Sequence, residues 1–242
     1  MKHSIRSSRG DRIFDAANTA LLSVVLVVVL YPLIFVVSAS ISDPAYVNSG
    51  RMWGWPRGIM FDGYERVFRN LDIWYGYGNT IFYTVLGTFI NLLFTLPCAY
   101  ALARKDLIGR NVIMGVFVVT MFFGGGLIPF YLLVKDLHML NTVWALVLPG
   151  AVSVWNIIIT RTFFQASIPR EIEEAAAMDG CSTTRLFVRV ILPLSAPIIA
   201  VMALFYGIGH WNGYFNAMIF LSDREKFPLQ LILREILIVQ QM

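Results

Sequence analysis

Five segments of the sequence are long and apolar enough to cross a membrane, and none of them contains a charged residue. A bilayer core about 30 Å thick requires about 20 apolar residues in a helix that rises about 1.5 Å per residue. Only 14% of the 242 residues are charged and 57% are hydrophobic, whereas a soluble domain has roughly a quarter of its residues charged. The sequence therefore predicts an all-α, multi-span membrane protein, with spans at approximately residues 16–41, 79–103, 112–134, 143–160 and 190–209.

The first apolar segment has some features of a signal peptide. Basic residues precede it, and the small residues Ser38 and Ser40 lie at its end. Its apolar run is longer than the core of a signal peptide, and four more spans follow. We therefore expect a retained first helix, with residues 1–15 as an N-terminal segment and residues 16–242 as one transmembrane domain.

The positions of the basic residues predict the orientation of the chain. Cytoplasmic loops carry an excess of Lys and Arg. If the N-terminus is cytoplasmic, eleven of the 19 basic residues lie on the inner side. The turn at 104–110, which holds three of them, is the strongest part of this bias. We expect a cytoplasmic N-terminus, with inner basic residues Lys2, Arg6, Arg9, Arg12, Arg104, Lys105, Arg110, Arg161, Arg170, Arg185 and Arg189.

The external stretch at 42–78 is rich in aromatic residues. Trp and Tyr are enriched where membrane meets water. An interfacial belt is one interpretation, and a docking surface for an extracellular partner is another. The residues in question are Trp53, Trp55, Tyr64, Trp74, Tyr75 and Tyr77.

The loop after the fourth span contains a short helix, predicted at about 169–180. Pro169 suits a first helical turn, because its missing N–H has no helical partner there. Three glutamates follow at the positive end of the helix dipole, and Gly180 supplies a stop signal. Ile172, Ala175 and Ala176 fall on one face at i, i+3, i+4 spacing, which suits the close approach of another surface. Helix signals alone allow a second interpretation, a structural corner between two spans.

The order of residues in this loop resembles the signature of binding-protein-dependent ABC importer permeases. The sequence reads Glu174-Ala175-Ala176, three residues, Gly180, nine residues, then Val190-Ile191-Leu192-Pro193. The family pattern has Ile where Val190 stands, so the apolar, β-branched character is kept. The stretches 124–129, 140–150 and 161–164 are similar to the carbohydrate-uptake branch, especially to maltose-type permeases and their polysaccharide-uptake relatives in Gram-positive bacteria.

The resemblance implies roles for these residues and a set of partners. The helix would couple to a cytoplasmic ATPase through Glu171, Glu174, Ala175, Ala176, Asp179 and Gly180, and its junction with the next span would be Val190, Leu192 and Pro193. The partners would be a second homologous permease, two ABC ATPase subunits, an extracellular sugar-binding lipoprotein and membrane lipid. The chain would need no cofactor of its own, because the ATPase would bind Mg-ATP. The family has six spans, so a C-terminal truncation is expected, with residues 227–234 facing the binding protein.

Two segments are candidates for the transport path. Residues 124–126 are three glycines followed by Pro129, and they interrupt the third span as a kink or as a flexible gate. Aromatic rings and amides at the end of the fifth span suit a sugar, although membrane interfaces collect the same residues. His210 is expected to form a local hydrogen bond instead of relaying protons. The candidate path residues are Tyr206, Trp211, Asn212, Tyr214 and Asn216.

Other functional classes find little support. The sequence contains no His-Glu-x-x-His, no Gly-x-Ser-x-Gly and no phosphate-binding Gly-x-x-x-x-Gly-Lys-Ser/Thr, so we predict no catalytic residue, no metal site and no ATP site. The five spans lack Asp and Glu, which ion-coupled transporters carry at membrane depth. Cys98 and Cys181 suggest neither a disulfide nor a metal site, and nothing indicates nucleic-acid binding. A non-sugar ABC importer, a passive channel and a scaffold remain as alternatives.

Overall fold

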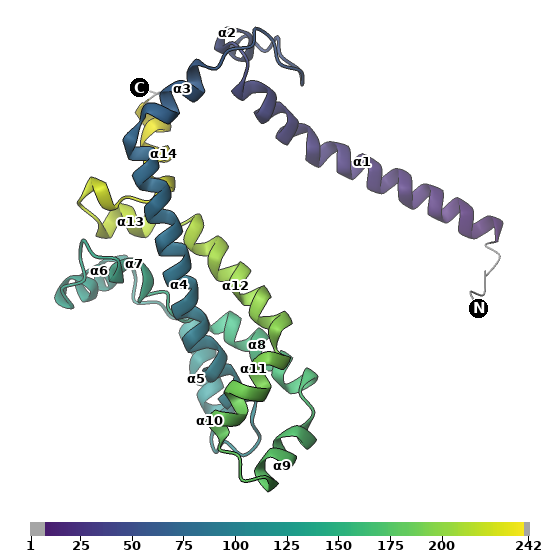
Figure 1. Ribbon diagram of the computed structural model, residues 1–242, viewed down its shortest axis with the longest axis vertical. Coiled ribbons are helices and arrows are strands. Elements are labelled where there is room, and N and C mark those ends of the chain that lie inside the picture. Colours follow the sequence, from purple (N-terminus) through teal and green to yellow (C-terminus); the bar gives the residue numbers. More distant parts are fainter. Residues whose placement is uncertain (1–7, 240–242) are drawn as a thin grey trace. The chain divides into compact units, whose positions relative to one another are not determined.

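The computed structural model describes residues 8–239, and every regular element among them is a helix. The chain divides into two compact units, at residues 1–70 and 71–242. Figure 1 shows their helices. The first unit contains α1 (Arg9–Ser40), α2 (Pro44–Asn48) and α3 (Asp62–Arg69). The all-α fold class is confirmed in the described residues.

The first unit consists mainly of the long helix α1. It begins with a capping box in which the Ser8 side chain accepts from the Asp11 N–H while the Asp11 carboxylate accepts from the Ser8 N–H. The N-terminal segment predicted at 1–15 is therefore helical from Arg9, while residues 1–7 lie outside the described part. No residue of the most apolar window of α1 is buried, so this helix presents its side chains to lipid or to another protein.

The loop that follows α1 is held by side chains near the end of that helix. Ser38 Oγ donates to the Gly54 carbonyl at 2.7 Å, and Ser40 Oγ lies 2.9 Å from the Tyr64 hydroxyl. Asp43 caps α2 by accepting from the Ala45 N–H. Trp53 and Trp55 are 80% and 86% exposed.

The second unit is built around α4 (Leu71–Ala103), which packs against α8 (Val154–Ser167), α12 (Ala196–Trp211) and α14 (Leu229–Val239). Figure 1 shows α12 alongside α4 and α14 beside the first turns of α4. Small residues let α4 and α12 approach closely: Gly87 faces the ring of His210, and Gly207 faces Thr84 and Thr88. A predicted span, 79–103, thus forms the central helix of this unit.

The predicted third and fourth spans are not continuous helices. In the third, α5 (Arg110–Phe122) and α6 (Leu127–Asp136) are bent by 112° across the glycines, where Gly126 has a φ of 84°. In the fourth, the one-turn α7 (Trp144–Val147) is separated from α8 by a loop containing Pro149 and Gly150. Proline denies the helix a backbone donor and glycine weakens it, which accounts for the break.

These breaks change the span count. Two described helices, α1 and α4, are long and apolar enough to cross a membrane, and up to four spans result if each bent pair is counted as one. At about 1.5 Å per residue, the 13 residues of α5 and the 14 of α8 rise only about 20 Å. The interruption expected at residues 124–126 of the third span is therefore present, whereas the span predicted at 143–160 is not one continuous helix.

The last predicted span also contains a bend. The π-helix η1 (Phe187–Ile191) follows α10 (Thr183–Leu186) and leads into α11 (Leu192–Leu194), and α12 then turns away by 81°. Ser195, which is fully buried, donates from Oγ to the Ile191 carbonyl at 2.6 Å. That bond satisfies a carbonyl at a bend where Pro193 and Pro197 supply no N–H.

Two further parts complete the second unit. The short helix α9 (Arg170–Met178) connects α8 to α10, at the opposite end of α4 from α14 (Figure 1). After α12 come α13 (Phe215–Phe220) and the 3₁₀ turn η2 (Arg224–Lys226). Asn141, with a φ of 59°, joins this region to the α6–α7 loop because its Oδ1 accepts from the N–H groups of Ser222 and Asp223.

Candidate functional site

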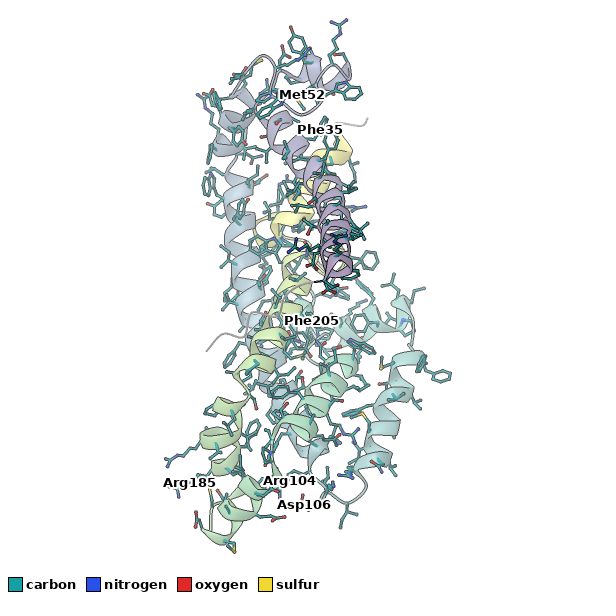
Figure 2. All side chains as sticks on the ribbon, turned by 90° about the vertical axis from the view of Figure 1, so that its right-hand side faces the viewer. Phe35, Met52, Arg104, Asp106, Arg185 and Phe205 are labelled. Carbon is teal, nitrogen blue, oxygen red and sulfur yellow. The ribbon has the colours of Figure 1, made fainter. Side chains whose placement is uncertain are left out.

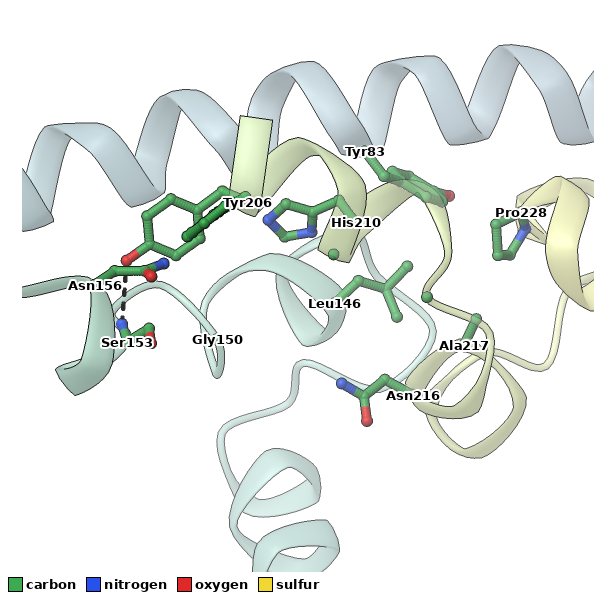
Figure 3. A pocket seen from close by; sticks show the side chains of 13 residues that line it. Tyr83, Leu146, Gly150, Ser153, Asn156, Tyr206, His210, Asn216, Ala217 and Pro228 are labelled. Atoms are coloured by element: carbon green, nitrogen blue, oxygen red, sulfur yellow. Dashed lines mark hydrogen bonds between the residues drawn. The ribbon is translucent and has the colours of Figure 1, made fainter. Parts of the chain in front are cut away.

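A cavity of about 300 Å³ lies beside the middle of α4 and is here called the central cavity (Figure 3). Its walls come from α4, α7, the α7–α8 loop, α8, α12, α13 and the residue that precedes α14. The lining is polar and aromatic but contains no Asp, Glu, Lys or Arg. The lining residues are Tyr83, Leu146, Gly150, Ser153, Asn156, Phe205, Tyr206, Gly209, His210, Gly213, Asn216, Ala217 and Pro228.

An asparagine and a histidine connect three walls of this cavity. His210 Nε2 lies 2.6 Å from Asn91 Oδ1, and Asn91 Nδ2 donates to the Gly150 carbonyl at 2.7 Å. Asn91 is fully buried, so its amide needs both partners. The local hydrogen bond predicted for His210 is confirmed.

Tyr206 forms a second connection between the same elements. Its hydroxyl lies 2.7 Å from Thr95 Oγ1 and accepts from the Ser153 N–H at 3.3 Å. That N–H is at the N-cap position of α8, where the first donors of a helix lack helical partners. The bond therefore anchors the start of α8 to α12 and α4.

The candidate path residues divide into two groups. Tyr206 and Asn216 line the central cavity, whereas Trp211, Asn212 and Tyr214 are not part of its lining. Asn212 Nδ2 donates to the Ile208 carbonyl of its own helix at 3.0 Å. The ring of Tyr214 lies under the Arg234 guanidinium, 5.4 Å from its carbon to the ring centroid.

Sequence reasoning missed the contribution of α4 to the cavity. Thr80, Tyr83, Thr84, Thr88, Asn91 and Thr95 recur every three or four positions in this apolar helix, which places them on one face. Polar groups at membrane depth are costly and tend to be functional. This stripe was the available signal, and its partners in α12 and the α7–α8 loop were not visible in the sequence.

The helix α9 carries the residues of the signature motif. Gly180 has a φ of 70°, and the Cys181 N–H donates to the Ala176 carbonyl at 2.9 Å, which ends the helix in the manner of a Schellman motif. Ser182 then caps α10 by accepting from the Arg185 N–H. The start and stop signals predicted for this helix are therefore present, with α9 beginning one residue after Pro169.

The faces of α9 differ from the sequence interpretation. Ile172 and Ala176 pack against the hydrophobic cluster of their own chain, because apolar residues four apart share the inner face of an amphipathic helix. Both side chains are partly buried there, so within the face predicted from Ile172, Ala175 and Ala176 only Ala175 is exposed. The exposed residues are Glu171, Glu174, Ala175, Met178, Asp179 and Gly180, with Met178 90% exposed.

The predicted junction lies directly after this region. Val190 belongs to η1, and Leu192 and Pro193 belong to α11. Val190 and Leu192 are partly buried against the same hydrophobic cluster as Ile172. The junction is thus packed on the inner faces of α9 and α4, and it is not a free linker.

A second cavity, of about 780 Å³, separates α9 from the ends of α4 and α8 and is here called the inner cavity. Its basic residues are Arg104, Lys105 and Arg110, and its acidic residues are Asp106, Glu173 and Glu174. Figure 2 shows Arg104 and Asp106 side by side at this end of the unit. The Tyr100 hydroxyl donates to Glu173 Oε1 at 2.9 Å across it.

The turn between α4 and α5 is closed by an ion pair. Arg104 donates from Nε to Asp106 Oδ1 at 2.8 Å and from Nη2 to Oδ2 at 2.5 Å, the bidentate geometry typical of Arg and carboxylate. These bonds hold the pKa of Asp106 below its ordinary value and raise the pKa of Arg104. Arg110 Nη1 also donates to the Arg104 carbonyl at 3.1 Å.

Across residues 8–239, no group of three or more His, Cys, Asp or Glu side chains is arranged to hold a metal ion. The central cavity is lined by uncharged hydrogen-bonding groups and rings, whereas the inner cavity carries charges of both signs. The central cavity is suited to bind hydroxyl groups, and the exposed face of α9 is suited to contact a basic protein surface.

Comparisons with known proteins agree with this arrangement. Residues 70–236 match the family described as "Binding-protein-dependent transport system inner membrane component". Protein LplC of Bacillus subtilis (strain 168) is 39% identical over 240 residues, which cover 99% of this chain and 81% of LplC. The polygalacturonan/rhamnogalacturonan transport system permease protein YtcP of the same organism is 39% identical, covering 95% of this chain and 80% of YtcP.

A solved structure is similar over nearly the whole chain. It is the crystal structure of a bacterial ABC transporter involved in the import of the acidic polysaccharide alginate, with a TM-score of 0.87 and 40% sequence identity. The match covers 96% of this chain and 82% of that one. The family match spans the whole α4–α13 arrangement that builds both cavities. On these grounds the chain belongs to the family of binding-protein-dependent transport system inner membrane components.

Proposed function

We propose that this chain is one permease half of an ATP-binding-cassette importer that moves an oligosaccharide across the cytoplasmic membrane. The observation that carries the proposal is the exposed face of α9, where two glutamates, an alanine and a methionine lie outside the long apolar helices. Such a face suits a protein partner, because glutamates attract basic residues and an alanine permits close contact. That partner is the cytoplasmic ATPase.

The ATPase supplies the chemistry, and this chain supplies the path. Mg-ATP binds to two ATPase subunits, and this chain binds no cofactor. Closure of the ATPase pair moves α9, and the transmembrane helices pass between two discrete packings. A second permease half completes the path, and the N-terminus and α9 lie on the cytoplasmic side.

The substrate class follows from the central cavity and from the relatives. Its volume of about 300 Å³ is at the lower end of the range of about 300–1,000 Å³ for small-molecule sites, so this half contacts only part of an oligosaccharide. Asn156 and Asn216 offer hydrogen bonds to hydroxyls, and Phe205 offers an apolar ring surface. The Tyr83 hydroxyl donates to the Lys226 carbonyl at 2.9 Å and is left as an acceptor. Relatives carry names that refer to sugars, including polygalacturonan and arabinooligosaccharides.

The uncharged lining of the central cavity indicates which groups of a sugar this half binds. Alginate is an acidic polysaccharide, yet the central cavity contains no Lys or Arg that would neutralise a carboxylate. This half therefore binds ring hydroxyls. An extracellular sugar-binding lipoprotein delivers the substrate to the outer side, where α14 and the residues 227–234 lie.

Purification of the chain from its native membrane, with mass spectrometry of its partners, tests the assembly. We expect a second permease, an ATPase with a phosphate-binding loop and a sugar-binding lipoprotein. The same complex in liposomes should hydrolyse ATP faster when a panel of oligosaccharides contains the substrate. A folded chain that carries none of these partners would favour the passive channel or scaffold alternatives, and stimulation by a non-sugar solute alone would favour a non-sugar importer.

A further inference from the structure

Tyr100 connects α9 to the helices that form the central cavity. Its side chain is 4% exposed, near the end of α4. Its hydroxyl donates to Glu173 Oε1 at 2.9 Å, and a bond of this type is charge-assisted because the acceptor is a carboxylate. This bond is the polar link between α9 and α4 in the described residues.

The ring of Tyr100 is held on two sides. It stacks on Phe187 of η1 with 5.1 Å between ring centroids, and it meets Phe164 of α8 edge-to-face at 5.7 Å. Four elements therefore converge on one side chain: α4 itself, α8, α9 and η1. Because η1 leads through α11 into α12, a shift of the Tyr100 ring would displace both α4 and α12.

The same helix, α4, carries the cavity contacts. Thr95, five residues before Tyr100, meets the Tyr206 hydroxyl, and Asn91 meets His210. α4 is one helix of 33 residues, with Pro97 lying between Thr95 and Tyr100 and removing one backbone donor. A packed helix of this kind carries displacement between the two sites. The hydroxyl of Tyr100 is thus connected through α4 to the two hydrogen bonds that shape the central cavity.

Glu173 differs from its neighbours in where its carboxylate lies. Glu173 and Glu174 both line the inner cavity, but Glu171 and Glu174 are exposed, whereas Glu173 is partly buried and its carboxylate accepts from the Tyr100 hydroxyl. The motif residue Glu174 and its neighbour Glu171 are therefore free to meet a partner, while Glu173 faces its own chain. The Glu173 carboxylate therefore forms the bond to α4, and the carboxylates of Glu171 and Glu174 are left for a partner protein.

We infer that Tyr100 is a positioning residue of the transport cycle, whose hydrogen bond to Glu173 transmits the movement of α9 to α4 and thereby couples ATP hydrolysis to opening of the central cavity. The inference rests on the proposed function. Without the bond, α9 still docks on the ATPase, because its exposed face is unchanged. ATP is then hydrolysed without a matching movement of the cavity walls.

The test uses the complete transporter in liposomes and measures sugar transported per ATP hydrolysed. Tyr100→Phe removes the hydroxyl and keeps the ring that Phe187 and Phe164 contact. We expect the ratio to fall about fivefold, as for the loss of one hydrogen bond, while ATPase co-purification stays at the wild-type level. Glu173→Ala should give the same fall, and the double variant should fall no further, because both changes remove one interaction.

Two controls separate coupling from folding. Glu173→Gln keeps an acceptor oxygen and should restore most of the ratio. Tyr131→Phe changes a tyrosine whose ring stacks on Phe220 in a different cluster, and it should leave the ratio unchanged. An unchanged ratio in Tyr100→Phe, or additive losses in the double variant, would overturn the inference. If wild-type chain neither binds an ATPase nor transports sugar, the proposed function fails instead.

Discussion

Substitution of Gly87 by Ala tests the close packing of α4 and α12 on which the central cavity depends. A Cβ at this position would lie 2.5 Å from His210 Cε1 and 2.8 Å from Cδ2, with Nε2 also in contact. Such distances are not tolerated between non-bonded carbon atoms. The imidazole must therefore rotate or α12 must move away, and either change breaks the 2.6 Å contact between His210 and Asn91.

The change in the free energy of unfolding caused by Gly87→Ala combines two destabilising effects and one stabilising effect. Overpacking a core costs about 1–3 kcal/mol, and leaving the buried Asn91 Oδ1 without a partner costs about 1–3 kcal/mol. Replacing Gly by Ala within a helix returns about 0.5–1 kcal/mol. Since relief of the clash and loss of the bond are the same movement, these costs overlap, and we expect a net loss of about 2–3 kcal/mol in the free energy of unfolding.

The assay is thermal or denaturant unfolding of the detergent-solubilised chain, together with uptake by the assembled transporter. Gly207→Ala is the matched control at the same interface, because its Cβ would meet Thr88 Oγ1 at 3.7 Å, an ordinary contact. Gly115→Ala in α5 is a second control, since nothing lies within 4 Å of its Cβ. Equal stability of the Gly87 and Gly207 variants would refute the packing argument.

Three further predictions concern the other parts of the account. Glu174→Lys reverses an exposed charge of α9 and should weaken ATPase co-purification, whereas Glu225→Lys in η2 should not; normal binding by the Glu174 variant would count against the docking role. Tyr206→Phe removes the bonds to Thr95 and to the start of α8, so we expect about a tenfold fall in uptake efficiency; Trp211→Ala should stay near wild type, and the reverse order would move the path away from the central cavity. Because Arg104 lowers the pKa of Asp106, their ion pair stabilises the fold above the unfolded pKa of about 3.9 and is lost as the pH falls through the lower folded value. The effect is small because Asp106 is exposed. As the pH falls from 7 to 3, the thermal midpoint should decrease less steeply in Asp106→Asn than in wild type.

The sequence was sufficient where a single local signal determines structure. The uninterrupted apolar run of α4 predicted a spanning helix, and Gly180 predicted the end of α9, where its φ of 70° suits glycine. The glycines at 124–126 predicted an interruption, which the structure shows as a 112° bend. In each case the residues that predict the structural feature lie within or directly beside it in the sequence.

The sequence was insufficient where structure depends on distant partners. Pro149 and Gly150 were visible, but the segment around them is apolar and contains no charged residue, so one span was predicted across them. The contact between Asn91 and His210 joins residues 119 positions apart, so it could not be read from spacing. The packing of Ile172 and Ala176 on their own chain was not foreseen, because such residues suit contact with a partner as well as contact with the hydrophobic cluster beneath them.

The central claim is that α9 contacts a cytoplasmic ATPase, and site-specific photocrosslinking tests it most directly. A photoreactive residue in place of Met178, which is 90% exposed on α9, should crosslink to an ATPase subunit in native membranes. The same residue in place of Trp55, which is 86% exposed after α1, is the control and should give no ATPase product. Crosslinking from Met178 to the ATPase is the result that the account predicts. Efficient labelling at Met178 with no ATPase among the products would contradict it.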